Sequence, residues 1–153
     1  MNDKVAIVTG GSRGVGRAAA AALLAEGAQV VISSVQPDSV KRAVAALEPL
    51  GRVAGIACDV AVEADVARLV RQTVETFGRL DAMVANAGTG GEYTNLADLE
   101  TQEWDAMIGV HLRGTFLCGR EAARAMRDAQ TPGRIRHRPE GNLGLSTALR
   151  NMR

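Results

Sequence analysis

The feature that most constrains this chain is a glycine-rich turn between a short apolar strand and an alanine-rich helix. Residues 4–9 predict a buried β-strand, because apolar and β-branched side chains occupy both of its faces. Residues 10–16 (Gly-Gly-Ser-Arg-Gly-Val-Gly) follow directly, and residues 17–26 predict a helix that ends at Gly27. A strand, a glycine turn and a helix in this order predict a dinucleotide-binding unit.

Three glycines of the turn have separate expected roles. Gly10 permits the tight turn, Gly14 lets the backbone approach a pyrophosphate, and Gly16 lets the helix pack closely on the sheet. The helix N-terminus supplies free N–H donors and a partial positive charge for a phosphate. A purely structural turn can have the same composition, and only the flanking strand and helix favour the ligand-binding interpretation.

The rest of the chain continues the alternation of strands and helices. Strands are predicted at residues 29–33, 52–58 and 80–85, helices at 37–47, 62–77 and 101–129, and the start of a fifth strand at 133–135. This alternation predicts an α/β fold, a Rossmann-type doubly wound parallel sheet truncated after about the fifth strand. We expect one dinucleotide-binding domain over residues 1–135, with its ligand at the carboxyl edge of the strands.

Composition and charge argue against several classes of protein. No apolar run approaches the ~18 residues of a membrane span, and no secretory leader precedes the first strand. We therefore expect a cytoplasmic protein without a membrane partner. Cys58 and Cys118 match no metal-binding spacing, so we expect two buried thiols and no metal. A net charge of +1 argues against a nucleic-acid partner.

The spacing T-G-x-x-x-G-x-G over residues 9–16 resembles the short-chain dehydrogenase/reductase family. Further segments match that family in the same order: Cys58-Asp59-Val60 after the third strand, Asn86-Ala87-Gly88 after the fourth, and Trp104-Asp105 followed by Val110-His111-Leu112-Arg113-Gly114-Thr115-Phe116. The family has N-N-A-G where this chain has Ala85 before Asn86. The resemblance spans residues 4 to about 135. It implies an NAD(P)-dependent oxidoreductase that transfers hydride between a nicotinamide and a carbonyl or alcohol substrate, as a homo-oligomer when complete.

The resemblance also implies which residues hold the cofactor. The carboxylate of Asp59 and a neighbouring backbone group would hold the adenine, while the segment from Asn86 would brace the sheet and line the nicotinamide pocket. Taken alone, Asp59 is also typical of a helix cap, and Asn86 of a turn. The expected cofactor-binding residues are Gly10, Ser12, Arg13, Gly14, Val15, Gly16, Ser34, Asp59, Val60, Asn86, Ala87 and Gly88.

The end of the second predicted strand bears on the choice of cofactor. NAD-specific folds place an acidic residue there to bind the ribose 2′-hydroxyl, but this chain has no acid between Ser33 and Asp38. The guanidinium of Arg13 can pair with a 2′-phosphate, although an arginine here is also typical of an exposed loop. We therefore expect NADP(H) to be favoured over NAD(H), with Ser34 near the ribose. A methyltransferase is disfavoured because it needs the same missing acid.

The family's proton donor is a tyrosine whose pKa is lowered by a lysine four residues later, and the pair follows the fifth strand. Here the single tyrosine is Tyr93, followed four residues on by Ala97, and the two lysines are Lys4 and Lys41. No Tyr–Lys pair exists in these 153 residues, and Tyr93 is expected in a substrate loop or at the surface. His111, at the family's catalytic Asn position, is the one remaining candidate acid, though alone it is typical of a core histidine. We expect no significant dehydrogenase activity from this chain.

The last residues form a different kind of sequence. Residues 131–153 hold five of the 18 basic residues and one of the 17 acidic residues. Residues 136–139 (Arg-His-Arg-Pro) cannot form a buried central strand, because their charges would need partners and proline lacks a donor. We expect an atypical basic tail over residues 136–153, from either a frame disruption or internal deletions. The second origin is suggested by residues 145–149, which faintly resemble the family's active-site helix.

This tail has consequences for the fold and for the function. We expect the fourth strand to lack an outer neighbour and the helix predicted at 101–129 to have an uncovered face, which favours aggregation or a partner. Two alternatives to an active oxidoreductase stay open: a non-catalytic nucleotide-binding module, and an incomplete product without a function. Binding of nucleic acid by the tail is disfavoured, because it has no interleaved aromatic residues.

Overall fold

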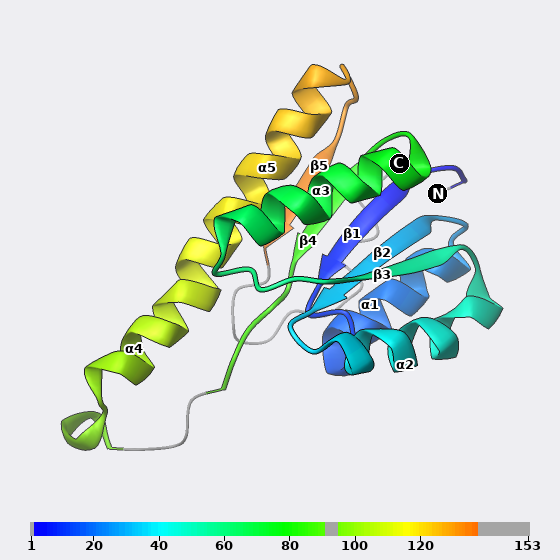
Figure 1. Cartoon of the computed structure of the whole chain (residues 1–153). Helices are drawn as coiled ribbons and strands as arrows, with labels where there is room; N and C mark the ends of the chain where they lie inside the picture. Colours follow the sequence, from blue (N-terminus) through cyan, green and yellow to red (C-terminus); the bar gives the residue numbers. More distant parts are fainter. Residues whose placement is uncertain (1, 91–94, 138–153) are drawn as a thin grey trace.

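Five parallel strands in the order β3-β2-β1-β4-β5 form the central sheet (Figure 1). The structure, a computed structural model, describes residues 2–90 and 95–137, so Tyr93 and the tail beyond His137 lie outside the described residues. The α/β doubly wound fold predicted from the sequence is confirmed. The strands are β1 (Val5–Thr9), β2 (Gln29–Ser34), β3 (Val53–Ala57), β4 (Ala82–Ala85) and β5 (Arg134–His137). The longer helices are α1 (Gly14–Ala25), α2 (Pro37–Leu47), α3 (Glu63–Phe77), α4 (Thr101–Ile108) and α5 (Gly114–Asp128).

Helices cover both faces of the sheet, and the alternation of side chains along each strand divides the core into two layers. On one face, Ile7 packs with Leu69 of α3 and Leu117 of α5. On the other face, Val8 packs with Leu23 of α1. The central strand β1 is buried along its whole length, as expected for a parallel strand covered on both sides. Among the described helices, none is long and apolar enough to cross a membrane.

Local sequence signals coincide with two of the helix ends. Pro37 lies at the start of α2, and Gly78 takes a left-handed conformation with φ +78° directly after α3. The predicted start of α1 at residue 17 is wrong, because the helix begins at Gly14. The last three residues of the glycine turn therefore belong to the first turn of α1.

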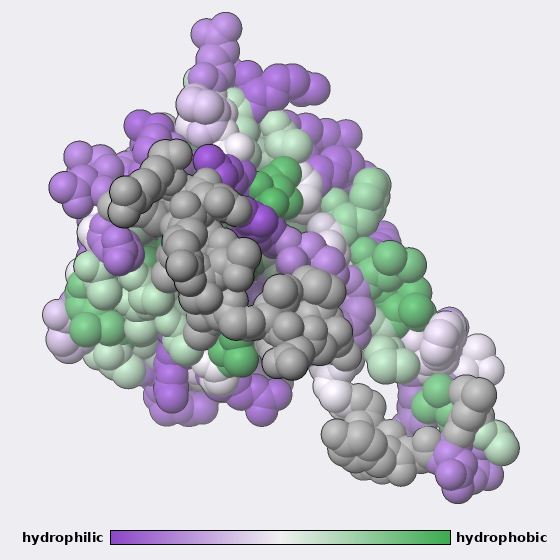
Figure 2. Space-filling model, turned by 180° about the vertical axis from the view of Figure 1, so that it is seen from behind, coloured by the Kyte–Doolittle hydropathy of each residue, from purple (hydrophilic) through white to green (hydrophobic). Residues whose placement is uncertain are grey.

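The long helix predicted at residues 101–129 is interrupted. After α4, residues Gly109–Arg113 form a π-helical turn, η3, before α5 begins at Gly114. Single π-turns inside α-helices are rare and are frequent at functional sites. His111 therefore lies in the π-turn and not in a regular helix. α4 extends away from the sheet as an arm, which is visible from the front and from behind (Figures 1 and 2).

The expectation that the fourth strand lacks an outer neighbour is wrong. β5 pairs in parallel with β4, with Ala85 opposite His137. The strand continues two residues beyond the predicted 133–135, but all four of its residues are exposed. It is therefore an edge strand among the described elements, in agreement with the expectation that Arg136 and His137 do not form a buried strand. The expected uncovered face is confirmed on the helical side, where Leu112 and Phe116 are 67% and 59% exposed.

A buried carboxylate fixes the opposite, amino edge of the sheet. Asp81 accepts hydrogen bonds from Lys4 Nζ at 3.1 Å, from the Val5 backbone N–H at 3.0 Å, and from Arg79 Nη2 at 2.6 Å and Nε at 2.8 Å. Burial alone would raise the pKa of Asp81, but these donors together hold it below its usual value. The cluster joins the starts of β1 and β4 and leaves the carboxyl edge free for a site.

Candidate functional site

A cleft of about 1370 Å³ runs along the carboxyl edge of the sheet. Loops that follow β1, β2, β3 and β4 line it, as does the π-turn η3, which is the usual location of a ligand site in an open parallel sheet. Every residue selected from the sequence lines this cleft: Gly10, Ser12, Arg13, Gly14, Val15, Gly16, Ser34, Asp59, Val60, Asn86, Ala87, Gly88 and His111. The structure therefore brings the whole predicted set together, while the role of each residue in binding stays a prediction.

The glycine turn is packed so tightly that three of its positions, Gly10, Gly11 and Gly16, leave no room for a side chain. A Cβ at Gly16 would collide with the Gly10 carbonyl oxygen and lie 2.5 Å from Asn86 Nδ2. A Cβ at Gly10, where φ is +65°, would lie 2.9 Å from the Ala87 Cα. Gly14 differs, because a Cβ there would meet no atom within 4 Å. Since Gly14 also lines the cleft, a side chain at this position would enter space available to a ligand.

The first turn of α1 fits an anionic ligand. Gly14, Val15 and Gly16 line the cleft, and the backbone N–H groups at the start of an α-helix have no partner within the helix. No side chain caps α1, and no acidic residue lies in its first turn. Free donors and the positive end of a helix dipole attract phosphate groups. These residues therefore fit the pyrophosphate of a dinucleotide.

Thr9 and Asn86 join the glycine turn to the end of β4. The buried Thr9 hydroxyl donates to the Val84 carbonyl at 3.3 Å and accepts from the N–H groups of Asn86 and Ala87, each at 3.1 Å. Asn86 Nδ2 in turn donates to the Thr9 carbonyl at 2.9 Å. Sequence reasoning missed the role of Thr9, although it is the first letter of the T-G-x-x-x-G-x-G pattern. The bracing expected of the segment after β4 is therefore present as hydrogen bonds.

Asp59 shapes the connection between β3 and α3. Its carboxylate accepts from the Ala61 N–H at 2.9 Å, and its own N–H donates to Asp65 Oδ2 at 3.0 Å. This N–H and the Arg68 guanidinium, 2.7 Å from Asp65 Oδ1, lower the pKa of the Asp65 carboxyl. Asp59 therefore bonds within the connection and does not cap α3, whose N-cap is Val62 without a side-chain hydrogen bond, and it also lines the cleft.

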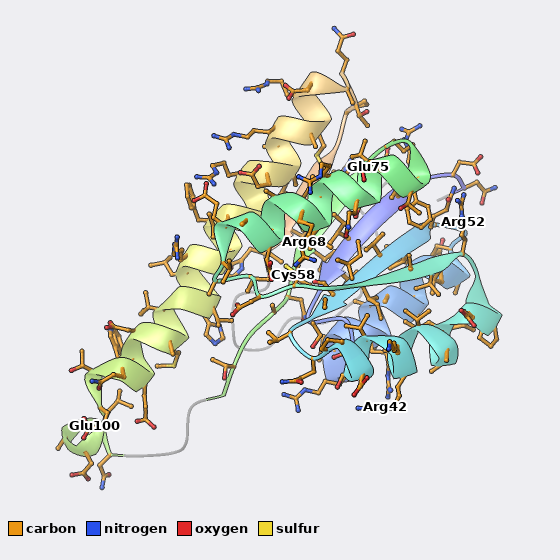
Figure 3. All side chains as sticks on the ribbon, in the orientation of Figure 1. Arg42, Arg52, Cys58, Arg68, Glu75 and Glu100 are labelled. Carbon is orange, nitrogen blue, oxygen red and sulfur yellow. The ribbon has the colours of Figure 1, made fainter. Side chains whose placement is uncertain are left out.

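The two cysteines are buried inside the molecule. Figure 3 shows Cys58 close to Arg68, between the end of β3 and α3. Burial raises the pKa of both Cys58 and Cys118 to about 12, so both thiols stay protonated at neutral pH. The predicted buried role is confirmed. Among the described residues, no three His, Cys, Asp or Glu side chains are grouped so that they could hold a metal ion.

The part of the cleft after β2 has polar side chains beside the apolar Val35, and it has no acidic side chain. Ser34, Gln36 and Ser39 line it, whereas the exposed Asp38 does not. Arg42 Nη2 donates to Ser39 Oγ at 3.2 Å. Arg13, from the glycine turn, lines the same cleft. These groups are able to donate hydrogen bonds to an anion, and no carboxylate lines this part of the cleft.

His111 connects the π-turn to the segment after β4 through contacts with the backbone of Thr89. Its Nε2 lies 2.8 Å from the Thr89 carbonyl oxygen and 3.2 Å from the Thr89 backbone nitrogen. The ring packs against Gly88, where a Cβ would lie 2.8 Å from His111 Cε1. Sequence reasoning placed His111 in the pocket but missed Thr89, because a backbone contact between residues 22 positions apart has no sequence signal.

A second histidine shares the cleft, so the expectation that His111 is the one candidate acid is wrong. His137, at the end of β5, also lines the cleft, and its Nδ1 lies 3.3 Å from the Thr115 hydroxyl. The sequence could not identify it, because its position depends on the pairing of β5 with β4 and on the register that sets Ala85 opposite His137.

Comparisons with known proteins agree with this geometry. The model of the short chain dehydrogenase family matches residues 4–136. A (5R,7aS)-5-hydroxy-7a-methyl-1-oxo-2,3,5,6,7,7a-hexahydro-1H-indene-carboxyl-CoA reductase from Mycobacterium tuberculosis is 41% identical over 138 residues, which cover 88% of this chain and 52% of that protein. Among solved structures, levodione reductase superposes with a TM-score of 0.84 at 32% identity, covering 90% of this chain and 54% of the other. A metagenomic short-chain oxidoreductase in complex with NADP gives a TM-score of 0.82 at 33% identity, covering 90% and 62%. The chain spans about half the length of the curated relatives it matches.

Proposed function

The chain belongs to the short chain dehydrogenase family, and from this premise we propose that its cleft binds a nicotinamide dinucleotide. In the whole protein, that cofactor would exchange a hydride with a small carbonyl or alcohol substrate. The observation that carries the proposal is the uncapped first turn of α1, which opens on the cleft beside Gly14. The cofactor supplies the hydride chemistry, and this part of the chain supplies the donors and the shape that hold its pyrophosphate.

We propose that NADP(H) is favoured over NAD(H). The polar lining after β2 supports this choice, since Ser34 replaces the acid that would bind a free ribose 2′-hydroxyl. Arg13 lies at the N-cap of α1 and lines the same cleft, so its guanidinium is available to a 2′-phosphate. A solved structure of a relative holds NADP.

A separate prediction concerns only the 153 residues of the printed sequence, assayed as a polypeptide of that length. The printed sequence contains no tyrosine followed four residues later by a lysine. Loss of a positioned general acid lowers a rate by on the order of 10²–10⁴. We therefore expect this chain to bind the cofactor but to reduce a panel of ketones, sugars and hydroxyacyl compounds more slowly than about 1 s⁻¹, the lower end of common turnover numbers.

The binding proposal is tested by two substitutions at one position. Gly14→Asp places a carboxylate in the cleft, and Gly14→Asn places an uncharged group of nearly the same shape there. Gly14 has φ +54°, and Asp and Asn are the side chains that best tolerate this region. The pair therefore differs mainly in charge.

NADPH affinity is measured by nicotinamide fluorescence for the wild type and both variants. We expect Gly14→Asp to bind at least about tenfold more weakly than Gly14→Asn, because its carboxylate repels the pyrophosphate. Circular dichroism checks that both variants are folded. Equal affinity of folded wild type, Gly14→Asn and Gly14→Asp would contradict the proposal, as would a folded wild type that binds no NADPH.

A further inference from the structure

The end of the cleft formed by β4 and β5 carries two imidazoles. His111 comes from the π-turn η3, and His137 comes from the end of β5, opposite Ala85 of β4. Both line the cleft. Thr115, the second residue of α5, contacts both segments, since its hydroxyl lies 2.6 Å from the His111 carbonyl oxygen and 3.3 Å from His137 Nδ1.

These two contacts predict which nitrogen of His137 carries a proton. The Thr115 hydroxyl has a single hydrogen, and its short bond donates that hydrogen to the His111 carbonyl. Its oxygen can then only accept from His137, so Nδ1 is the protonated nitrogen. The other nitrogen, Nε2, can gain a proton without any change in this bond. His137 therefore keeps its bond to Thr115 in both its neutral and its charged form.

The strand order indicates that the two halves of a dinucleotide would lie at opposite ends of the cleft. The glycine turn, Ser34 and Asp59 follow β1, β2 and β3, and the order reverses between β1 and β4. A dinucleotide lies across such a reversal, with one nucleotide on each side. If the adenosine half lies over β1, β2 and β3, the nicotinamide half lies over β4 and β5. That ring carries a positive charge when it is oxidised and none when it is reduced.

Among the residues that the structure describes, few other ionisable side chains line the cleft. Of the described residues that line it, the ionisable ones are Arg13, Cys58, Asp59, His111 and His137. The one carboxylate follows β3, at the far edge of the sheet from β5. Of the elements packed against β5, β4 contributes Ala85, opposite His137. α5 contributes Thr115 and the buried, protonated Cys118, and its charged Arg120 and Glu121 pair with each other, Arg120 also with Glu63 of α3. Arg134 and Arg136 lie on the opposite face of β5, because side chains alternate along a strand.

We propose that His137 makes the cleft select the reduced cofactor. When its imidazole is protonated, it repels the cationic oxidised nicotinamide and leaves binding of the neutral reduced ring unchanged. The inference rests on the proposed function, because it requires that the cleft binds the dinucleotide. It assigns to His137 a role in distinguishing the two redox states.

The test compares the affinities of NADPH and NADP⁺ between pH 5 and 8, the range in which histidine changes charge. In the wild type, the ratio of the NADP⁺ to the NADPH dissociation constant should rise by about three- to tenfold as the pH falls, the order expected when two like charges repel each other in a partly solvated site. In His137→Asn the ratio should stay constant, because the amide can still donate to Thr115 but cannot take up a proton. His111→Asn shows how much of the wild-type effect comes from the other imidazole.

The outcomes separate the two proposals. Binding of both cofactors with a ratio that does not change with pH, or a ratio that changes equally in wild type and His137→Asn, would overturn the role of His137 alone. Failure of the folded wild type to bind either cofactor would overturn the proposed function and this inference with it. A separate measurement needs no cofactor: the ¹⁵N chemical shifts should show His137 protonated at Nδ1 in the wild type, and Thr115→Val should abolish that preference. The Nε2-protonated form in the wild type would contradict the proposal.

Discussion

Two buried hydroxyls on one face of the sheet should respond in opposite ways to removal. Thr9 and Ser33 are register partners on β1 and β2, and both side chains are buried. The Thr9 hydroxyl makes three hydrogen bonds to the end of β4. Ser33 Oγ has no hydrogen-bond partner among the described residues. The two positions are therefore matched in neighbouring strands, in burial and in the hydroxyl group they carry, and they differ in the number of hydrogen bonds that this hydroxyl makes.

Thr9→Val keeps the shape of the side chain but leaves the N–H groups of Asn86 and Ala87 without their acceptor. Leaving a buried donor unsatisfied costs about 1–3 kcal/mol, and water at the cleft relieves part of this. We therefore expect a loss of about 2–4 kcal/mol in the free energy of unfolding. For a chain of this size, that corresponds to a fall in Tm of roughly 5–15 °C. Ser33→Ala removes a hydroxyl that makes no bond, so we expect a change between zero and about 1 kcal/mol in the stabilising direction.

Urea denaturation followed by circular dichroism measures both changes, and equal m-values show that the denatured states are comparable. The affinity for NADPH gives a second comparison. Thr9→Val removes the hydrogen bonds that hold the cleft-lining segment at Asn86 and Ala87, so it should weaken binding, whereas Ser33→Ala should not. Equal losses of stability in the two variants would refute the reasoning, since the hydrogen bonds of Thr9 would then contribute nothing. A large loss in Ser33→Ala alone would refute it as well.

Three further predictions concern other parts of the molecule. Asp81→Asn should lower the free energy of unfolding by about 2–3 kcal/mol, the value of hydrogen bonds to a charged group. Because the folded-state pKa of Asp81 is lowered, its contribution is present above about pH 4 and is lost as the pH falls below that. Denaturation of wild type and variant at pH 7 and pH 3 should show the difference shrinking, and a constant difference would contradict this. Cys58 and Cys118 should react with a thiol reagent at pH 8 only after unfolding, and fast labelling of the folded protein would contradict their raised pKa values. Ser34→Asp should shift the NADPH to NADH affinity ratio toward NADH relative to Ser34→Asn, and an unchanged ratio would show that Ser34 is not at the ribose.

The sequence predicted the order and type of the elements because each one carries a local signal. The apolar run of β1, the glycines of the turn and Pro37 at the start of α2 all act within a few residues. The carboxyl ends of parallel strands share one edge of the sheet. The same local signals were therefore enough to predict which residues lie together in the cleft. The predicted family is confirmed, and so is the parallel sheet.

Features that depend on tertiary contacts were not predicted. The π-turn that contains His111 has no sequence periodicity of its own, and Gly114 beside it packs so closely on Val60 that a Cβ would lie 2.7 Å from Val60 Cγ2. The role of Thr9 requires knowledge of which strand lies beside β1. The position of His137 in the cleft depends on β5 pairing with β4, which its exposed arginines argued against.

Backbone amide chemical shifts during titration with NADPH would test the binding proposal most directly. We predict that the largest changes fall on the turn from Gly10 to Gly16, on Ser34 and on the segment from Asn86 to Gly88, which come from three separate loops of the same cleft. The amides around Asp81, at the opposite edge of the sheet, should change little and serve as the internal control. Saturable changes confined to the three loops would support dinucleotide binding in the cleft. No change at saturating NADPH, or changes centred elsewhere, would contradict it.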